Sequence, residues 1–212
     1  MKTYIGNTRY KILDANGRRL MMAAKGKPYD AEVEYLESDG TQWIDTNFVP
    51  DDTSGLYIKA YANKKFANAI AVGVRQTSGD TRWWINYSTT LEISWNTWIG
   101  YNVTYANVIT EVENNFLNSK TGKINGVIKR TTYPTLSNIT NSAYLFIGNL
   151  YGTTTASPFI GRIYNVKFSR NNTIVMDMIP VRVGQVGYMY DKVSGQLFGN
   201  SGTGNFILGN DK

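Results

Sequence analysis

Short runs of alternating apolar and polar residues, separated by turn residues, repeat along most of the sequence. A period of two is the pattern of a half-buried β-strand. In residues 56–61, for example, Leu56, Ile58 and Ala60 would share one buried face. The chain has 20 Gly and 5 Pro, which favours tight turns between short strands. This pattern predicts an all-β fold of the sandwich or barrel type.

The strand pattern is clear in most places and ambiguous in one. Residues 108–116 fit helical spacing and strand spacing equally, and we predict a strand there. The Asn125-Gly126 pair predicts a hairpin turn, because both residues tolerate positive φ. The predicted strands cover residues 31–36, 56–61, 69–74, 82–87, 91–95, 98–105, 108–116, 123–128, 144–148, 160–168, 173–178 and 187–190.

The net charge of +6 is concentrated at the N-terminus. Residues 1–28 contain seven basic residues and one acid, whereas the remainder has 15 of each. The acids begin directly afterwards: residues 29–58 contain eight acids and no Lys or Arg. A basic segment beside an acidic one can pair with it, in the same subunit or the next. The basic residues alternate with strand formers rather than cluster, so we do not expect nucleic-acid binding.

The basic segment also has a hairpin signature. Residues 9–13 and 18–22 flank an Asn16-Gly17 turn, and a linker follows. We therefore predict a basic N-terminal arm over residues 1–28 and a folded domain over residues 29–212. An isolated two-stranded hairpin is marginally stable, so we expect the arm to dock on a partner. The residues expected to anchor it are Arg9, Lys11, Arg18 and Arg19.

Two residue types are absent. The sequence has no Cys and no His, so it forms no disulfide and lacks the commonest general base and the commonest metal ligand. We therefore predict that the protein is not an enzyme and binds no metal. No apolar run approaches 18 residues, so we expect no membrane insertion. The first 13 residues also lack the apolar stretch of a secretion signal.

Three segments carry a family resemblance: YLESDGTQWIDT (35–46), FIGRIYNVKF (159–168), and the closing stretch 188–206. They resemble the opening strands, a late strand and the final hairpin of laminin-G-like, concanavalin-A-like jelly-roll domains. Such domains are seen in phage virion proteins and in surface proteins of gut bacteria. The resemblance implies two antiparallel sheets packed face to face, with the domain's termini close together. It does not fix a function, because this fold hosts lectins, glucanases and structural modules.

The arm refines the functional expectation. Residues 3–8 resemble short strand repeats of phage structural proteins. We therefore predict a virion accessory protein on the phage particle surface: head-decorating, head-fibre or tail-associated. Its expected partners are other virion proteins through the arm, further copies of itself, and host-surface polysaccharide. The alternatives are a carbohydrate-binding module of a bacterial surface protein, located on the cell surface, and a glycoside hydrolase.

Aromatic residues are the candidate ligand contacts. Trp83 and Trp84 are adjacent in a predicted strand, so their side chains point to opposite faces. If one fills the core, the other is expected to face solvent or a partner. Exposed rings can stack on the apolar face of a sugar. The predicted ligand-binding residues are Trp84, Tyr87, Trp98 and Tyr101.

Carboxylates are the candidates for catalysis. Glu32 and Glu34 share one face of a strand, as in the acid-rich strand of concanavalin-A-like glucanases, and Glu37 would need a bulge to join them. Glu111 and Glu113 form a second such pair. We favour a solvated face for all of them.

Calcium is the usual cofactor that the resemblance implies. Four acids in loop-rich sequence offer oxygen ligands, and none matches a metal-binding motif. We therefore predict no cofactor. The four acids are Asp39, Asp45, Asp51 and Asp52.

Overall fold

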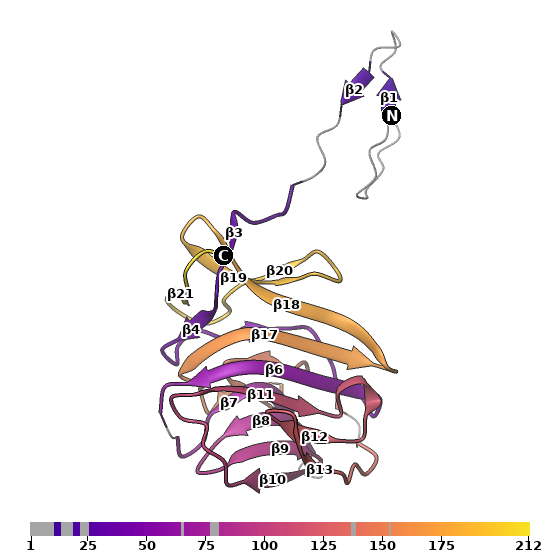
Figure 1. Cartoon of the computed structure of the whole chain (residues 1–212), viewed down its shortest axis with the longest axis vertical. Helices are drawn as coiled ribbons and strands as arrows, with labels where there is room; N and C mark the ends of the chain where they lie inside the picture. The colour runs from indigo at the N-terminus through magenta and orange to yellow at the C-terminus, as the bar shows by residue number, and fades with distance from the viewer. Residues whose placement is uncertain are drawn as a thin grey trace.

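The structure is a computed structural model that describes residues 11–13, 19–21, 26–64, 66–76, 81–136, 139–152 and 154–212. Nearly all regular structure in these residues is β (Figure 1). The strands are β1 (Lys11–Leu13), β2 (Arg19–Met21), β3 (Ala31–Glu32), β4 (Leu36–Ser38), β5 (Ile44–Asp45), β6 (Ser54–Ala62), β7 (Ile70–Arg75), β8 (Arg82–Tyr87), β9 (Leu91–Trp95), β10 (Thr97–Tyr101), β11 (Ile109–Asn114), β12 (Gly122–Ile124), β13 (Val127–Arg130), β14 (Tyr144–Leu145), β15 (Gly148–Leu150), β16 (Thr154–Ala156), β17 (Gly161–Arg170), β18 (Thr173–Val183), β19 (Val186–Asp191), β20 (Leu197–Phe198) and β21 (Ile207–Leu208). A short 3-10 helix, η2 (Phe116–Asn118), follows β11.

Apart from the pair β1–β2, the described strands form two sheets. The small sheet runs in the order β10-β9-β8-β7-β14-β5, with β15 and β16 beside it. The large sheet runs in the order β13-β12-β11-β6-β17-β18-β19-β20, and β3, β4 and β21 join it. Pairing is antiparallel along both paths, whereas β15 runs parallel to β7. The predicted all-β class and two-sheet sandwich are confirmed.

Most predicted strands agree with the observed ones, but residues 31–36 are divided between β3 and β4, and residues 144–148 between β14 and β15. Residues 82–87 and 91–95 coincide with β8 and β9. The ambiguous stretch 108–116 is a strand over Ile109–Asn114, as predicted, and then turns into η2. Residues 98–105 are not one strand, because β10 ends at Tyr101.

Aromatic rings fill the space between the two sheets. Trp83 of β8 and Phe168 of β17 are fully buried, with ring centroids 5.9 Å apart. Phe48, from the segment between β5 and β6, stacks on Phe168 at 4.6 Å and lies 5.8 Å from Trp83. Aromatic pairs of this kind contribute about 0.5–1.5 kcal/mol each beyond their burial. This trio therefore fixes the small sheet against the large one.

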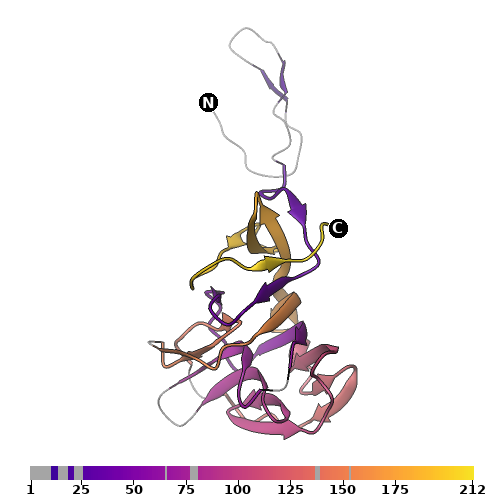
Figure 2. The same ribbon diagram turned by 90° about the vertical axis from the view of Figure 1, so that its left-hand side faces the viewer.

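Strands β17 and β18 diverge, and the chain at residues 31–38 fills the gap. In this segment β4 pairs with one end of β17, and β3 pairs with the far end of β18. The C-terminal segment lies along the opposite edge of residues 31–38, because β21 pairs with β4 and Val33 forms a β-bridge with Asp211. The two views show the segment around β3 and β4 beside the C-terminus (Figures 1 and 2). The two ends of the predicted domain are thus neighbours, as the resemblance implied.

The predicted arm hairpin is present in the part of the arm that the structure describes. β1 and β2 are antiparallel, with Ile12 opposite Leu20 and Leu13 opposite Arg19. Among the described strands, they pair with each other alone. A helix with the length and hydropathy needed to span a membrane does not occur in the described residues.

Candidate functional site

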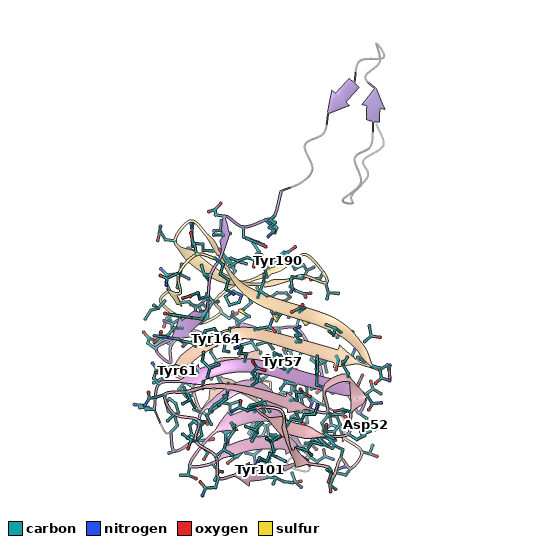
Figure 3. The ribbon with its side chains drawn as sticks, viewed as in Figure 1. Asp52, Tyr57, Tyr61, Tyr101, Tyr164 and Tyr190 are labelled. Atoms are coloured by element: carbon teal, nitrogen blue, oxygen red, sulfur yellow. The ribbon has the colours of Figure 1, made fainter. Side chains whose placement is uncertain are left out.

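Strand alternation gives the large sheet one buried face and one outer face. Leu56, Ile58 and Ala60 of β6 point into the core and are fully buried, as predicted. Tyr57 and Lys59 lie between them and point outward. The labelled tyrosines of β6 and β17, Tyr57, Tyr61 and Tyr164, lie near one another in Figure 3.

A β-bulge in β17 places two consecutive side chains on this outer face. Ile163 pairs with Ala60 and Asn165 pairs with Lys59, so Tyr164 is an extra residue with no partner in β6. Ile163 is buried, whereas Tyr164 and Asn165 are both half-buried. Bulges are frequent next to binding and active sites, because they redirect side chains.

An open groove of about 670 Å³ crosses the outer face at this bulge. This volume lies within the range of ligand-binding clefts. Five cations, two carboxylates, two tyrosines, one amide and two aliphatic side chains line the groove. The lining residues are Glu34, Tyr35, Lys59, Ile109, Arg162, Tyr164, Asn165, Lys167, Asp177, Ile179, Lys192 and Lys212.

One part of the groove is aromatic. The rings of Tyr35 and Tyr164 meet edge to face with centroids 5.6 Å apart. The Arg162 guanidinium lies 4.3 Å from the centroid of Tyr35 and 5.2 Å from that of Tyr61, close enough for cation–π attraction. The Nε of Arg162 is 2.7 Å from Oε2 of Glu37. These contacts hold the rings in a fixed arrangement on the sheet.

The other part of the groove is built around Asp177. Its Oδ2 is 2.8 Å from Nζ of Lys192 and 3.9 Å from Nζ of Lys167, and its Oδ1 accepts a bond of 3.1 Å from Nδ2 of Asn165. Burial alone would raise the pKa of Asp177, but the bonds from Lys192 and Asn165 and the charge of Lys167 outweigh it. The pKa of Asp177 is therefore below its usual value, and the carboxylate stays ionised at neutral pH.

The combination of tyrosine rings, one amide and several lysines in this groove suits recognition of a sugar chain. Tyrosine rings offer apolar faces with a polar edge. Asn165 and the lysines offer donors to hydroxyl or acidic oxygens. A general acid for glycoside hydrolysis needs a raised pKa, and the pKa of Asp177 is lowered, so Asp177 does not suit that role. The groove lining offers aromatic rings and hydrogen-bond donors to a ligand.

The predicted aromatic contacts are not in this groove. Trp83 and Trp84 do point to opposite sides of the small sheet, and Trp83 belongs to the core. The expectation of an exposed Trp84 is wrong, because this side chain is only 5% exposed. The Arg82 guanidinium lies 5.1 Å from its ring centroid. Gly73 packs directly against it, so a Cβ on Gly73 would lie 2.1 Å from Cβ of Trp84.

The other predicted aromatics are also dispersed. Tyr87 is fully buried in the core, and its hydroxyl hydrogen-bonds Thr110 Oγ1 at 2.5 Å, so its ring does not reach a surface ligand. Tyr101 is half-buried and packs against the core from β10, far from Tyr164 in Figure 3. Trp98 lies in the same strand, and its side chain is outside the described part of the structure.

The predicted anchoring residues belong to the arm. Lys11 and Arg19 lie in β1 and β2, where their backbones pair with Met21 and Leu13. Arg9 and Arg18 lie outside the described residues.

The acids considered for catalysis, for which a solvated face was predicted, have separate partners. Glu32 Oε1 accepts bonds from Lys27 Nζ at 3.0 Å and from the Tyr29 hydroxyl at 2.9 Å. Glu34 lines the groove and accepts a bond from Asn210. Glu37 forms an ion pair with Arg162.

The second pair of acids, on β11, is also paired. Glu111 contacts Lys59, and Glu113 contacts Lys123.

The four acids considered for calcium stabilise loops. Asp39 accepts bonds from the backbone and side chain of Thr41, and Asp45 accepts from the backbone of Asn47. Asp51 and Asp52 likewise accept bonds from backbone amides. Over the described residues, no group of three or more His, Cys, Asp or Glu side chains is placed to hold a metal ion.

Comparison with known proteins gives a likeness in fold. No protein-family model and no curated protein sequence matches this chain. Among solved structures, a candidate carbohydrate-binding protein from Bacteroides ovatus is similar, with a TM-score of 0.55 at 12% sequence identity. The match covers 84% of this chain and 60% of the other, so this chain spans about three fifths of that protein's length. The two proteins share an all-β sandwich fold.

Proposed function

We propose that this protein is a non-enzymatic carbohydrate-binding domain that binds a polysaccharide in the groove on the outer face of the large sheet. The observation that carries the proposal is the pair of tyrosine rings, Tyr35 and Tyr164, in contact with each other in the lining of an open groove beside hydrogen-bond donors. The fold likeness to a candidate carbohydrate-binding protein supports it.

The test is a glycan-array screen followed by calorimetry on the strongest binder. Tyr164→Ala is expected to weaken binding at least about tenfold, which corresponds to about 1.4 kcal/mol. Tyr164→Phe keeps the ring and is expected to retain most of the affinity. The matched control is Tyr151→Ala, because Tyr151 is 36% exposed and lies outside the groove lining. Equal loss in Tyr151→Ala, or no loss in Tyr164→Ala, would place the ligand elsewhere.

The glycoside hydrolase alternative has its own assay. Of the acids considered for catalysis in the sequence, Glu34 is the one that lines the groove. Incubation with the bound polysaccharide should release no reducing ends. Release that disappears in Glu34→Gln would make the protein an enzyme and overturn the non-enzymatic part of the proposal.

The virion role stays a separate proposal for the arm. Within the described residues, β1 and β2 pair with each other alone, and an isolated two-stranded hairpin is marginally stable without a partner. Immunogold labelling of phage particles with antibody against residues 29–212 tests the location. Replacement of Arg18 and Arg19 by Glu is then expected to abolish incorporation. Normal incorporation of this variant would contradict anchoring through the arm.

A further inference from the structure

The charges that line the groove are unevenly matched. Lys59 has Glu111 as its partner at 3.1 Å, and Arg162 has Glu37 at 2.7 Å. Lys167 and Lys192, by contrast, both face the single carboxylate of Asp177. Within the groove lining, these two lysines therefore share one carboxylate.

The shared carboxylate is fixed in place. The backbone N–H of Asp177 donates to Oδ1 of Asp191 at 2.8 Å. Asp191 is itself buried and accepts bonds from Val193 and Ser194 in the turn after β19. Asp177 thus belongs to a network that holds it below the two lysines.

The two ammonium groups remain accessible from solvent. The side chains of Lys192 and Lys167 are 47% and 31% exposed, whereas that of Asp177 is 16% exposed. An anion that approaches the sheet therefore meets the lysines before the carboxylate. Charge-assisted hydrogen bonds of this kind are about twice as strong as neutral ones.

The lysines stand at a useful distance from the tyrosine pair. Lys167 follows Tyr164 by three residues on the same face of β17, which corresponds to roughly 10 Å along a strand. A chain that stacks on Tyr164 can therefore place an acidic group at Lys167 and Lys192. Asn165 lies between these two positions.

We propose that the ligand of the groove is an acidic polysaccharide, whose carboxylate or sulfate groups bind Lys167 and Lys192 while its sugar rings contact Tyr35 and Tyr164. This inference rests on the proposed carbohydrate-binding function and specifies its ligand class.

The test uses two matched pairs of polymers: polygalacturonate with its fully methyl-esterified form, and dextran sulfate with dextran. Binding is measured by affinity electrophoresis and calorimetry at two salt concentrations. The acidic member of at least one pair is expected to bind at least tenfold more tightly than its neutral partner, with an advantage that shrinks at higher salt. A difference within the polygalacturonate pair would indicate a carboxylate ligand, and a difference within the dextran pair would indicate a sulfate ligand.

Two variants separate a built site from general attraction to basic protein. The double variant Lys167→Gln/Lys192→Gln should lose at least tenfold affinity for the acidic polymer. Lys129→Gln is the matched control, because Lys129 is exposed on β13 and outside the groove lining. Thermal unfolding confirms that both variants are folded.

The outcomes distinguish this inference from the proposed function. Equal binding of acidic and neutral polymers, lost in Tyr164→Ala, would overturn the acidic ligand and keep the carbohydrate-binding function. An equal loss in Lys129→Gln and in the double variant would also overturn it, because the attraction would then be diffuse. Failure to bind any glycan, here and on the array, would overturn both proposals.

Discussion

Arg130 joins the two sheets through backbone acceptors. The side chain is buried, with 3% of its surface exposed. Its guanidinium donates to the carbonyl oxygens of Ile93 at 2.9 Å, Trp95 at 3.0 Å, Thr97 at 3.1 Å and Thr132 at 2.9 Å. Burial lowers the pKa of Arg130. One residue of the large sheet thereby satisfies acceptors on β9 and β10 of the small sheet.

Removal of this guanidinium should be costly. Arg130→Met keeps apolar volume but removes the side-chain donor to two buried carbonyl groups, those of Ile93 and Trp95, so we expect the free energy of unfolding to fall by about 3 kcal/mol. Urea denaturation measures this change in the free energy of unfolding. The neighbouring variant Lys129→Met, on an exposed side chain, should change it by less than about 0.5 kcal/mol. Similar values for the two variants would contradict this role of Arg130.

The solvent exposure of single side chains was the hardest property to infer from the sequence. Alternation correctly placed Trp83 and Trp84 on opposite faces, because that depends on strand geometry alone. It could not show that Trp84 is only 5% exposed on that face, with the Arg82 guanidinium over its ring. A ring that points out of a sheet is therefore not necessarily exposed.

The bulge in β17 is the element that places Tyr164 and Asn165 together in the groove lining. Because Ile163 and Asn165 pair with consecutive residues of β6, deletion of Tyr164 would restore regular alternation without shifting the register. We expect this deletion variant to fold, with a melting temperature within a few degrees of the parent, and to lose glycan binding. Circular dichroism melting and calorimetry test the two parts. A variant that does not fold would show that the bulge is structural, and one that binds normally would show that the tyrosine pair is not the site.

The strands were predictable and the groove was not. Strand positions follow from local alternation, and β6, β8 and β9 matched it closely. The groove instead gathers residues from segments far apart, such as Glu34, Asp177 and Lys212. They meet because residues 31–38 fill the gap between β17 and β18. One local signal was readable: Ile163 and Val166 are three residues apart, which a regular strand with one buried face does not allow.

The whole molecule should be sensitive to acid and insensitive to pH near neutrality. It has no His. Among the described residues, five carboxylates have a lowered pKa through hydrogen bonds and ion pairs, in Asp51 and Asp177 despite the larger single effect of burial. The five are Glu32, Asp39, Asp51, Asp177 and Asp211. Glu92 acts in the opposite direction, because burial raises its pKa.

The sign of the effect follows from linkage. A carboxylate with a lowered folded pKa stabilises the protein above its unfolded pKa, and this contribution disappears as the pH falls through the folded value. The ordinary values are 3.8 for Asp and 4.5 for Glu. We therefore expect a constant free energy of unfolding between about pH 6 and 8 and a steep decrease below about pH 4. Urea denaturation across this range tests it, and Asp177→Asn should make the acid decrease shallower. A protein equally stable at pH 3 and pH 7 would contradict this expectation.

The neighbouring positions of residues 31–34 and 210–212 have a practical consequence for engineering. Glu34 and Lys212 both line the groove, so a tag or fused domain attached at the C-terminus starts at the mouth of the groove. The start of the predicted domain, after the arm, and the C-terminus are close enough for a short linker to join them, because the backbone N–H of Lys212 donates a hydrogen bond to the carbonyl oxygen of Glu32. A circular permutant with new termini at the exposed Asn125-Gly126 turn would move every attachment point to the far edge of the large sheet. Surface immobilisation through those termini would then leave the groove facing the solution.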